Sequence, residues 1–224
     1  MEKNISQPAI GSKSKLPRSW QFFRSVERSK LAFATIIISG IRVSQSASEA
    51  EIESKIGAEI ELFKSDWASL TKSRRLPGLR FRGAFEFDLS RSRDVHGHRE
   101  SLFSDMGVQP LVGDDIIINL HVHMLIACSR CDADNLSEEL RRKWPGRWRV
   151  VVKSLFENQS TDEAVSNIYG YINKQICRYA SGGIGDIPVT FGNDWEPVWL
   201  KKIGRLYKCM SLEFRSSDRW LYNI

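Results

Sequence analysis

The sequence predicts an α+β fold, with an antiparallel β-sheet that carries helices on one face and leaves the other face polar. Two patterns support this prediction. Segments in which apolar and polar residues alternate indicate half-buried strands, and segments with an apolar residue every three or four positions indicate amphipathic helices. Along the chain these segments follow the order β-α-β-β-α-β-α. That order is typical of a sheet whose helices form one layer.

The composition indicates one folded domain with short extensions. Of the 224 residues, 42% are hydrophobic, and seven tryptophans and eleven phenylalanines can supply a core. The net charge of +6 favours a polyanionic partner such as DNA or RNA. We divide the chain into a flexible basic arm (1–25), a folded domain (26–180) and a C-terminal helical extension (181–224).

The first predicted elements are a strand over residues 31–42 and a helix from Ser46 to Leu70. The helix is predicted from apolar residues spaced three or four apart, which are Ile52, Ile56, Ile60, Phe63, Trp67 and Leu70. Pro77 and Gly78 then break the chain.

The second predicted strand runs from Leu79 to Leu89 and has one apolar and one polar face. The apolar face carries Phe81, Phe85, Phe87 and Leu89, and the polar face carries Arg80, Arg82, Glu86 and Asp88. Residues 90–113 form a polar connection that is longer than a compact hairpin needs, so we expect a functional loop or a mobile flap. Its His96 and His98 fit a solvated loop better than a metal site.

The third predicted strand contains a pair of histidines. Its even positions from Ile116 to Ile126 are all apolar, so His121 and His123 project together from the opposite face. Neutral imidazole is a good ligand for divalent metals. The pair is therefore a candidate metal site.

The remaining elements complete the predicted order. A short helix from Leu136 to Trp144 ends at Pro145-Gly146, and a strand from Arg147 to Leu155 alternates basic residues with Trp148, Val150 and Val152. Ser160 and Glu163 form a capping-box pattern that opens a helix running to about Ala180. A last helix is expected over Pro197–Lys208. Its Trp195, Trp199, Ile203 and Leu206 have the spacing of core residues.

The polar face of the predicted sheet collects a set of residues suited to phosphate chemistry. Two imidazoles with the carboxylate of Glu86, or alternatively of Asp88, suit Mg²⁺ or Mn²⁺. The basic residues expected on the same face suit a nucleic-acid backbone, and they are Arg80, Arg82, Arg147, Arg149 and Lys153. In the helix that follows, Tyr171 and Lys174 are three residues apart and share a face. A phenol in that place could attack phosphorus.

Three segments together resemble the HUH endonucleases of the replication-initiator (Rep) type, in particular the rolling-circle plasmid Rep proteins and phage initiators. They are Arg82–Asp88, His121–Leu125 and Tyr171–Lys174, in that order. The resemblance implies an HUH/RRM-like core in residues 26–180, with His121, His123 and Glu86 as metal ligands. It implies that Tyr171 attacks the scissile phosphate and forms a 5′-phosphotyrosine and a free 3′-OH. Lys174 would stabilise the phosphoryl oxygens or hold the helix to DNA.

The same resemblance implies the partners and the biological role. The substrate would be origin DNA, single-stranded or in a hairpin, and the role would be initiation of rolling-circle replication of a plasmid or phage-like element. A host DNA polymerase would extend the free 3′-OH. A host helicase would separate the strands, because the chain has no Gly-x-x-x-x-Gly-Lys-[Ser/Thr] motif of its own, which an ATP-driven helicase would need.

Several features leave alternatives open. Asn167 stands one turn before Tyr171, where many family members have a second Tyr or a Glu, and Asn119 stands where plasmid Rep proteins often have another histidine. Tyr169 is an alternative nucleophile. A single-tyrosine HUH transposase is an alternative role, and a noncatalytic nucleic-acid-binding module with an RRM-like sheet is an alternative class.

The cysteines and the N-terminal region predict a reduced, cytoplasmic protein, and the Rep resemblance implies a bacterial host. No signal peptide is recognised, and the apolar run from Ala32 to Ile38 is too short to span a membrane, so no membrane association is expected. Cys128 and Cys131 have metal-site spacing, but a structural zinc is not expected because no second ligand pair follows. Free thiols are therefore expected.

Overall fold

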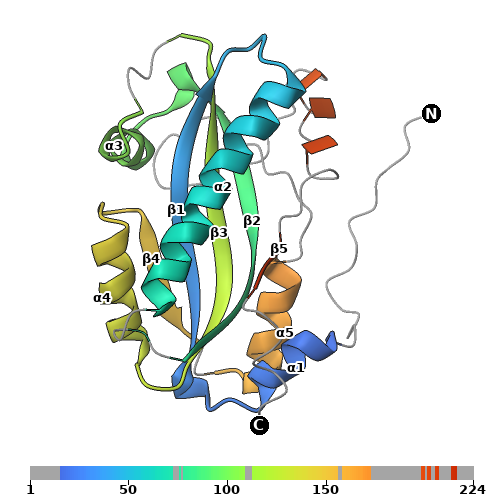
Figure 1. The fold of residues 1–224 in the computed structure, drawn as a ribbon, viewed down its shortest axis with the longest axis vertical. Coiled ribbons are helices and arrows are strands. Elements are labelled where there is room, and N and C mark those ends of the chain that lie inside the picture. The colour runs from blue at the N-terminus through green and yellow to red at the C-terminus, as the bar shows by residue number, and fades with distance from the viewer. Residues whose placement is uncertain are drawn as a thin grey trace, which may run out of the picture.

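The computed structural model of the chain (Figure 1) describes residues 16–72, 76, 78–108, 113–155, 158–172, 198–199, 201–202, 205–206 and 213–215. These residues form an α+β structure with one five-stranded antiparallel sheet in the order β4-β1-β3-β2-β5. The strands are β1 (Leu31–Val43), β2 (Leu79–Arg91), β3 (Ile116–Cys128), β4 (Val150–Ser154) and β5 (Glu213–Arg215). The predicted fold class and antiparallel sheet are thus observed.

The histidine strand β3 lies at the centre of the sheet. β1 pairs with one of its edges and β2 with the other, along almost its whole length. All of its residues are buried except Asn119, which is partly buried. A strand in this position has its backbone hydrogen-bonded on both sides, so the side chains that it carries are held in a fixed place.

One face of the sheet is covered by α2 (Glu49–Lys72) and α4 (Ala133–Lys143). The six apolar residues predicted for α2 are all buried, and they pack in one core with Ile36 of β1 and Val122 of β3. In Figure 1, α2 crosses diagonally over the long strands. Asp132 caps α4, because its side chain accepts a hydrogen bond from the Asn135 N–H at 2.8 Å.

Helices also cover the histidine face, so the prediction of a one-sided helix layer was wrong. α1 (Arg18–Arg24) and α5 (Thr161–Ile172) pack on Leu125 and Ala127 at one end of that face. α3 (His98–Asp105) packs Phe103 on Ile117 at the other end. The physical reason lies in β3, where the positions facing the histidine side are polar only in the middle and apolar at both ends. Those apolar ends need covering.

Two segments within the predicted folded domain differ from their sequence predictions. The connection 90–113 contains a 3-10 turn, Ser92–Asp94, and the helix α3, whose Leu102 and Phe103 are buried, so it is not simply a polar loop. The strand predicted from Arg147 begins at Val150 and ends at Ser154, because residues 147–149 form a turn.

The predicted basic arm and C-terminal extension also contribute to the core. Residues 16–24, expected in the flexible arm, include α1 with buried Trp20 and Phe23, and a 3-10 turn follows at Arg28–Lys30. The described positions 198–199, 201–202 and 205–206 are helical, and Trp199 and Leu206 are buried in the α2-side core as predicted. β5 then adds a strand beside β2, which the helical prediction missed.

Cys128 and Cys131 are joined as a disulfide at the end of β3, whereas the sequence predicted free thiols. Their Cα atoms are 5.5 Å apart, which is within the normal span of a disulfide. No helix within the described ranges is both long and apolar enough to cross a membrane.

Gly83 of β2 should be sensitive to substitution because it lies against the histidine strand. A Cβ at this position would approach the His123 carbonyl oxygen to 2.3 Å and Met124 Cγ to 2.6 Å. We expect Gly83→Ala to lower the free energy of unfolding by about 1–3 kcal/mol, as overpacking of a core does. Urea denaturation measures this.

The matched control is Gly57→Ala in the middle of α2, where a Cβ would meet no atom within 4 Å. This change should raise the free energy of unfolding by roughly 0.5–1 kcal/mol, because alanine favours the helix over glycine. Equal effects of the two substitutions would contradict the close approach at Gly83.

Candidate metal centre

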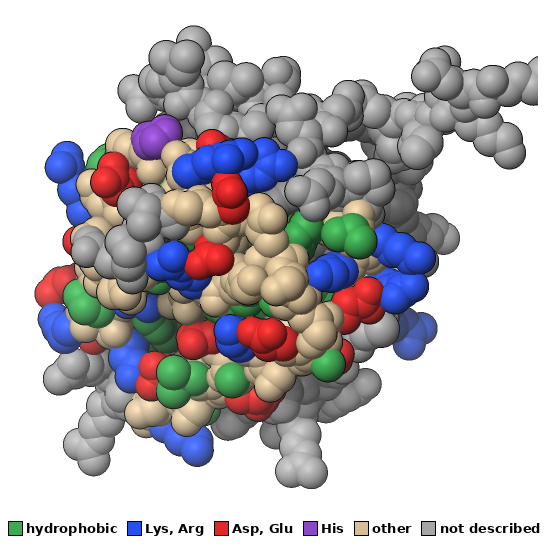
Figure 2. Space-filling model, turned by 90° about the horizontal axis from the view of Figure 1, so that it is seen from above, with side chains coloured by type: hydrophobic (Ala, Val, Ile, Leu, Met, Phe, Trp, Pro, Cys, Tyr) green, Lys and Arg blue, Asp and Glu red, His purple; other side chains and the backbone are tan. Residues whose placement is uncertain are grey.

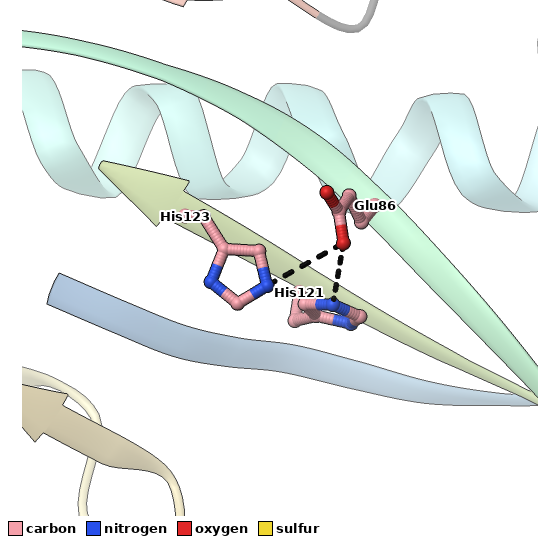
Figure 3. Close-up of side chains that lie close together, drawn as sticks. All are labelled: Glu86, His121 and His123. Carbon is pink, nitrogen blue, oxygen red and sulfur yellow. Dashed lines mark ion pairs between the residues drawn. The ribbon is translucent and has the colours of Figure 1, made fainter. Parts of the chain in front are cut away.

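Glu86, His121 and His123 converge at the centre of the histidine face. Glu86 Oε2 lies 3.5 Å from His121 Nε2 and 3.4 Å from His123 Nε2. The three ligand atoms are all within 4.8 Å of one another, so the group could hold a metal ion. Figure 3 shows the three side chains together, with Glu86 from β2 and the histidines from β3.

The register of the sheet produces this arrangement. His121 is the direct cross-strand partner of Glu86, so their side chains leave neighbouring strands at the same level and on the same face. His123 is two residues further along β3 and shares the face by the alternation of the strand. The sequence predicted the shared face, and the pairing of β2 with β3 brings the groups into contact.

Each histidine has its second ring nitrogen engaged by a separate oxygen. His123 Nδ1 lies 2.8 Å from Thr35 Oγ1 of β1, and His121 Nδ1 lies 3.2 Å from the backbone oxygen of Asn119. In the neutral form of each histidine, an Nδ1–H that donates to its oxygen leaves the Nε2 lone pair available to a metal ion on the side where Glu86 lies. This is the outer contact that orients metal-binding histidines. The donor chemistry and these contacts both fit a divalent ion.

Thr35 is therefore expected to position His123 for metal binding. Thr35→Val keeps the shape of the side chain but removes the hydroxyl, and it should weaken Mn²⁺ binding by roughly 10- to 100-fold. Isothermal titration calorimetry measures the affinity directly. Thr35→Ser keeps the hydroxyl and should stay close to wild type. Equal losses in both variants would mean that Thr35 acts through packing alone.

An aromatic group borders the metal centre. The Phe33 ring of β1 stacks on the His123 ring with centroids 5.7 Å apart and planes 11° apart. Tyr171 of α5 stands edge-on to His123 at 5.0 Å and to Phe33 at 5.7 Å. Tyr171 is 37% exposed, so part of its side chain is accessible to solvent beside the metal centre. The structure thus brings the predicted tyrosine beside a predicted metal ligand.

Electrostatics favour a negative charge on Glu86 and a positive charge beside it. Burial alone would raise the pKa of Glu86, but hydrogen bonds from His121 and His123 outweigh burial and lower the pKa from 4.5 to about 2. Burial alone would lower the pKa of His121, but the hydrogen bond to Glu86 and the charges of Asp88 and Glu86 raise it above 6.5. The metal-free site is thus an ion pair below the raised pKa of His121.

Metal affinity should consequently increase with pH. A proton must leave Nε2 of His121 before a metal can bind there, and its pKa is raised, so protons compete with the metal to pH values above 6.5. Below that raised pKa, we expect the Mn²⁺ dissociation constant to fall by up to about tenfold per pH unit. Titrations between pH 5.5 and 8.5 test this. A constant affinity across the range would contradict proton competition.

Asp88, the alternative to Glu86, lies outside the cluster. It lies two residues after Glu86 on β2, and its cross-strand partner on β3 is Asn119. Burial raises its pKa, against the opposing charges of His121 and Arg99. Among the described residues, the group whose ligand atoms converge contains Glu86 and does not contain Asp88.

The basic residues predicted to contact DNA fall into two groups. Arg82 is 2% exposed, and Arg149 donates from Nε and Nη2 to the Ile37 and Ile38 carbonyl oxygens at 3.2 and 2.7 Å. Both side chains are therefore engaged within the protein itself. The sequence had predicted that they contact the backbone of a nucleic acid. Arg80 is partly buried beneath Phe22, with its guanidinium 4.4 Å from the ring centroid. Arg147 and Lys153 are exposed, and a DNA contact stays a prediction for them.

Positive and negative side chains of the described residues are mixed at one end of the molecule. Figure 2 views the end of the molecule at the top of Figure 1, and Lys/Arg and Asp/Glu side chains lie intermingled there. Ion pairs account for part of this mixture, including Arg42–Asp115 and Arg93–Asp114. The net charge alone therefore does not mark a DNA-binding surface at that end.

The tyrosine helix separates the two candidate nucleophiles. Tyr169 packs against Trp20 of α1 with ring centroids 5.1 Å apart, away from the histidines. Tyr171 lies beside His123. Asn167, one turn before Tyr171, donates to Gln159 at 3.3 Å. Lys174 and the predicted continuation of the helix to Ala180 lie outside the described residues.

Two residues of the site were missed by the sequence prediction, namely Phe33 and Thr35. Both lie on odd positions of β1, and Thr35 is the direct cross-strand partner of His123. The alternation of the first strand could have placed them on one face. Local periodicity does not indicate that β1 pairs with β3, because the two strands are far apart in the sequence. Thr35 and His123 are 88 positions apart.

Comparison of the chain with models of protein families, with curated proteins and with solved structures finds no significant match. The site is therefore interpreted from its own geometry.

Proposed function

We propose that this protein is a metal-dependent DNA nicking and joining enzyme of the HUH Rep type, which uses Tyr171 as its nucleophile. The observation that carries the proposal is the position of an exposed tyrosine 5.0 Å, ring to ring, from a histidine of the Glu86-His121-His123 cluster. Mg²⁺ or Mn²⁺ is the proposed cofactor. An ion bound by this cluster would polarise a phosphoryl oxygen of the substrate.

In the proposed reaction, the Tyr171 phenol oxygen bonds to phosphorus while the bond from phosphorus to the 3′ oxygen breaks. The phenol loses its proton and the leaving 3′ oxygen gains one, so the products are a 5′-phosphotyrosine and a free 3′-OH. The number of phosphodiester-type bonds does not change. Because the bond energy is kept, the reverse reaction can rejoin a strand.

The biological role follows from the product. A free 3′-OH can be extended by a host polymerase, so we propose initiation of rolling-circle replication of a plasmid or phage-like element, in the bacterial cytoplasm. A host helicase would separate the strands. The fold supports this function to the extent that it is an α+β structure with an antiparallel sheet, whose central strand carries the two histidines.

A single-tyrosine transposase would use the same chemistry on the ends of a mobile element. A noncatalytic binding module is less well supported. Sheets that bind RNA by stacking expose aromatic rings, whereas the centre of this face carries two histidines and a carboxylate with fixed mutual distances.

The test is formation of a covalent protein–DNA adduct. Protein is incubated with Mn²⁺ and single-stranded DNA from candidate origins and element ends, labelled in turn at its 5′ and 3′ ends. Denaturing gels should show protein joined to the 3′-side fragment, and a released 5′-side fragment that a polymerase extends. EDTA should prevent both.

The polarity of the adduct decides between mechanisms. An adduct on the opposite fragment would contradict the 5′-phosphotyrosine. Binding of single strands with no adduct on any of these substrates would favour the binding module. Adducts on element ends but not on origins would favour the transposase.

A further inference from the structure

We infer that Trp148 is a stacking site for one unpaired base of a DNA strand that leaves the metal centre across the β4 edge of the sheet. This inference deepens the proposed function and rests on its DNA substrate. It uses an exposed tryptophan and a histidine, His98, that the nicking chemistry does not involve.

The turn that carries Trp148 is held firmly to the sheet. Arg149 binds the carbonyl oxygens of Ile37 and Ile38, and the Ile37 N–H donates to the Arg149 carbonyl at 2.8 Å. These bonds occur where the pairing of β1 with β3 shifts register, between Ile37 and Ser39. The neighbouring Trp148 is thus presented from a fixed backbone.

The Trp148 ring is exposed and surrounded by groups that suit a nucleotide. The side chain is 40% exposed. The Arg147 guanidinium carbon lies 4.9 Å from its ring centroid, and the His98 ring lies at 5.7 Å with a 55° tilt. A cation and an aromatic edge beside an exposed ring are the parts from which base-stacking platforms are built. Asp105 also approaches the turn near Gly146, so stacking and not net charge is the main attraction.

The ring lies within reach of the metal centre. Ile37 is the cross-strand partner of His121, and Arg149 is bonded to Ile37, so two strand spacings of about 4.8 Å separate the His121 and Arg149 backbones. The backbone next to Trp148 is therefore roughly 10 Å from the His121 backbone across the sheet. The contact of the Trp148 ring with His98, the first residue of α3, places the ring toward the helix that packs on the histidine face.

The surface between the two places is open among the described residues. Val151 and Lys153 share the histidine face of β4, because they pair with Thr35 and Phe33, and both are exposed. Helices α1 and α5 cover one end of this face and α3 the other, while β5 borders β2. The β4 side is thus the edge across which the DNA strand leaves the centre, past Val151, and Lys153 adds a positive charge further along β4, away from Trp148.

The experiment measures binding of a fluorescein-labelled, mixed-sequence 20-nucleotide single strand of DNA by anisotropy in EDTA, where no strand is cut. Trp148→Ala should weaken binding roughly 5- to 100-fold, the range expected for loss of one stacked base. Trp148→Phe keeps an aromatic ring and should recover most of the affinity. Leu62→Ala, at a 60% exposed site on α2, is the control on the other face and should bind as wild type.

Photocrosslinking gives a readout that a folding defect would not imitate. Strands carrying single 5-iododeoxyuridines should crosslink to Trp148 from one or two neighbouring positions, as mapped by mass spectrometry. An abasic site at the same position should abolish the difference between wild type and Trp148→Ala. Wild-type affinity in Trp148→Ala, or crosslinks that never reach Trp148, would overturn the inference. Tighter binding of the same sequence as RNA or as duplex DNA would overturn the single-stranded DNA occupant.

The outcomes separate this inference from the proposed function. If the wild type forms the covalent adduct and Trp148→Ala binds DNA equally well, the stacking site is wrong and the nicking activity stands. If no adduct forms on any substrate while Trp148 still crosslinks, the nicking activity is wrong and the binding site stands. If both hold, Trp148→Ala should raise KM for adduct formation and leave kcat within about threefold.

Discussion

Tyr171→Phe should abolish the covalent adduct with DNA while leaving DNA and Mn²⁺ binding intact. The substitution removes only the phenolic oxygen, and the ring that contacts His123 and Phe33 remains. Because no other group would replace the nucleophile, the rate of adduct formation should fall by at least about a thousandfold. Single-turnover assays on denaturing gels measure the rate, and calorimetry with Mn²⁺ checks the site.

Tyr169→Phe is the matched control for this prediction. It is two residues away on the same helix and packs against Trp20, so its loss should leave adduct formation within about threefold of wild type. An adduct that persists in Tyr171→Phe and disappears in Tyr169→Phe would reverse the assignment of the nucleophile.

Loss of Glu86 should have the second large effect, this time on the metal. In Glu86→Ala the two imidazoles lose the carboxylate that lies 3.4 and 3.5 Å from their Nε2 atoms. Mn²⁺ affinity should fall by more than the roughly 10- to 100-fold typical of an outer partner, and the adduct should disappear with it. Electron paramagnetic resonance of Mn²⁺ reports free and bound ion without requiring activity.

Asp88→Asn serves as the comparison, because this carboxyl group lies on the same strand and face but outside the ligand cluster. Its Mn²⁺ affinity should stay within about fivefold of wild type. If Asp88→Asn loses the metal and Glu86→Ala keeps it, Asp88 is the ligand and the cluster must rearrange on binding.

Glu86 and Arg82 show which properties of the site the alternation pattern predicts and which it does not. Alternation placed Glu86 on the polar face of one strand and His121 and His123 on the polar face of another, and these three side chains do meet. Alternation also placed Arg82 on that face, correctly, but suggested that it is exposed. The position is buried beside the apolar end of the face, where Leu125 is its cross-strand partner.

Arg149 shows the same limit from a different cause. The sequence pattern extended the fourth strand back to Arg147, because basic and apolar residues alternate there. In the structure these residues form a turn, and the guanidinium of Arg149 satisfies two carbonyl oxygens where β1 shifts register. A register shift in another strand has no local signature in residues 147–149.

By itself, the sequence determined the four longer strands, the helices α2 and α4, and the face of each strand, because side-chain direction in a strand follows from position alone. It thereby determined the candidate ligands, while the candidate tyrosine came from the resemblance to the Rep-type enzymes. Only the tertiary structure decided that Thr35 orients His123, that α5 lies on the histidine face with Tyr171 beside the cluster, and that Trp148 is presented at the sheet edge. The physical reason is that these contacts depend on strand pairing and helix docking between distant segments, which local periodicity does not specify.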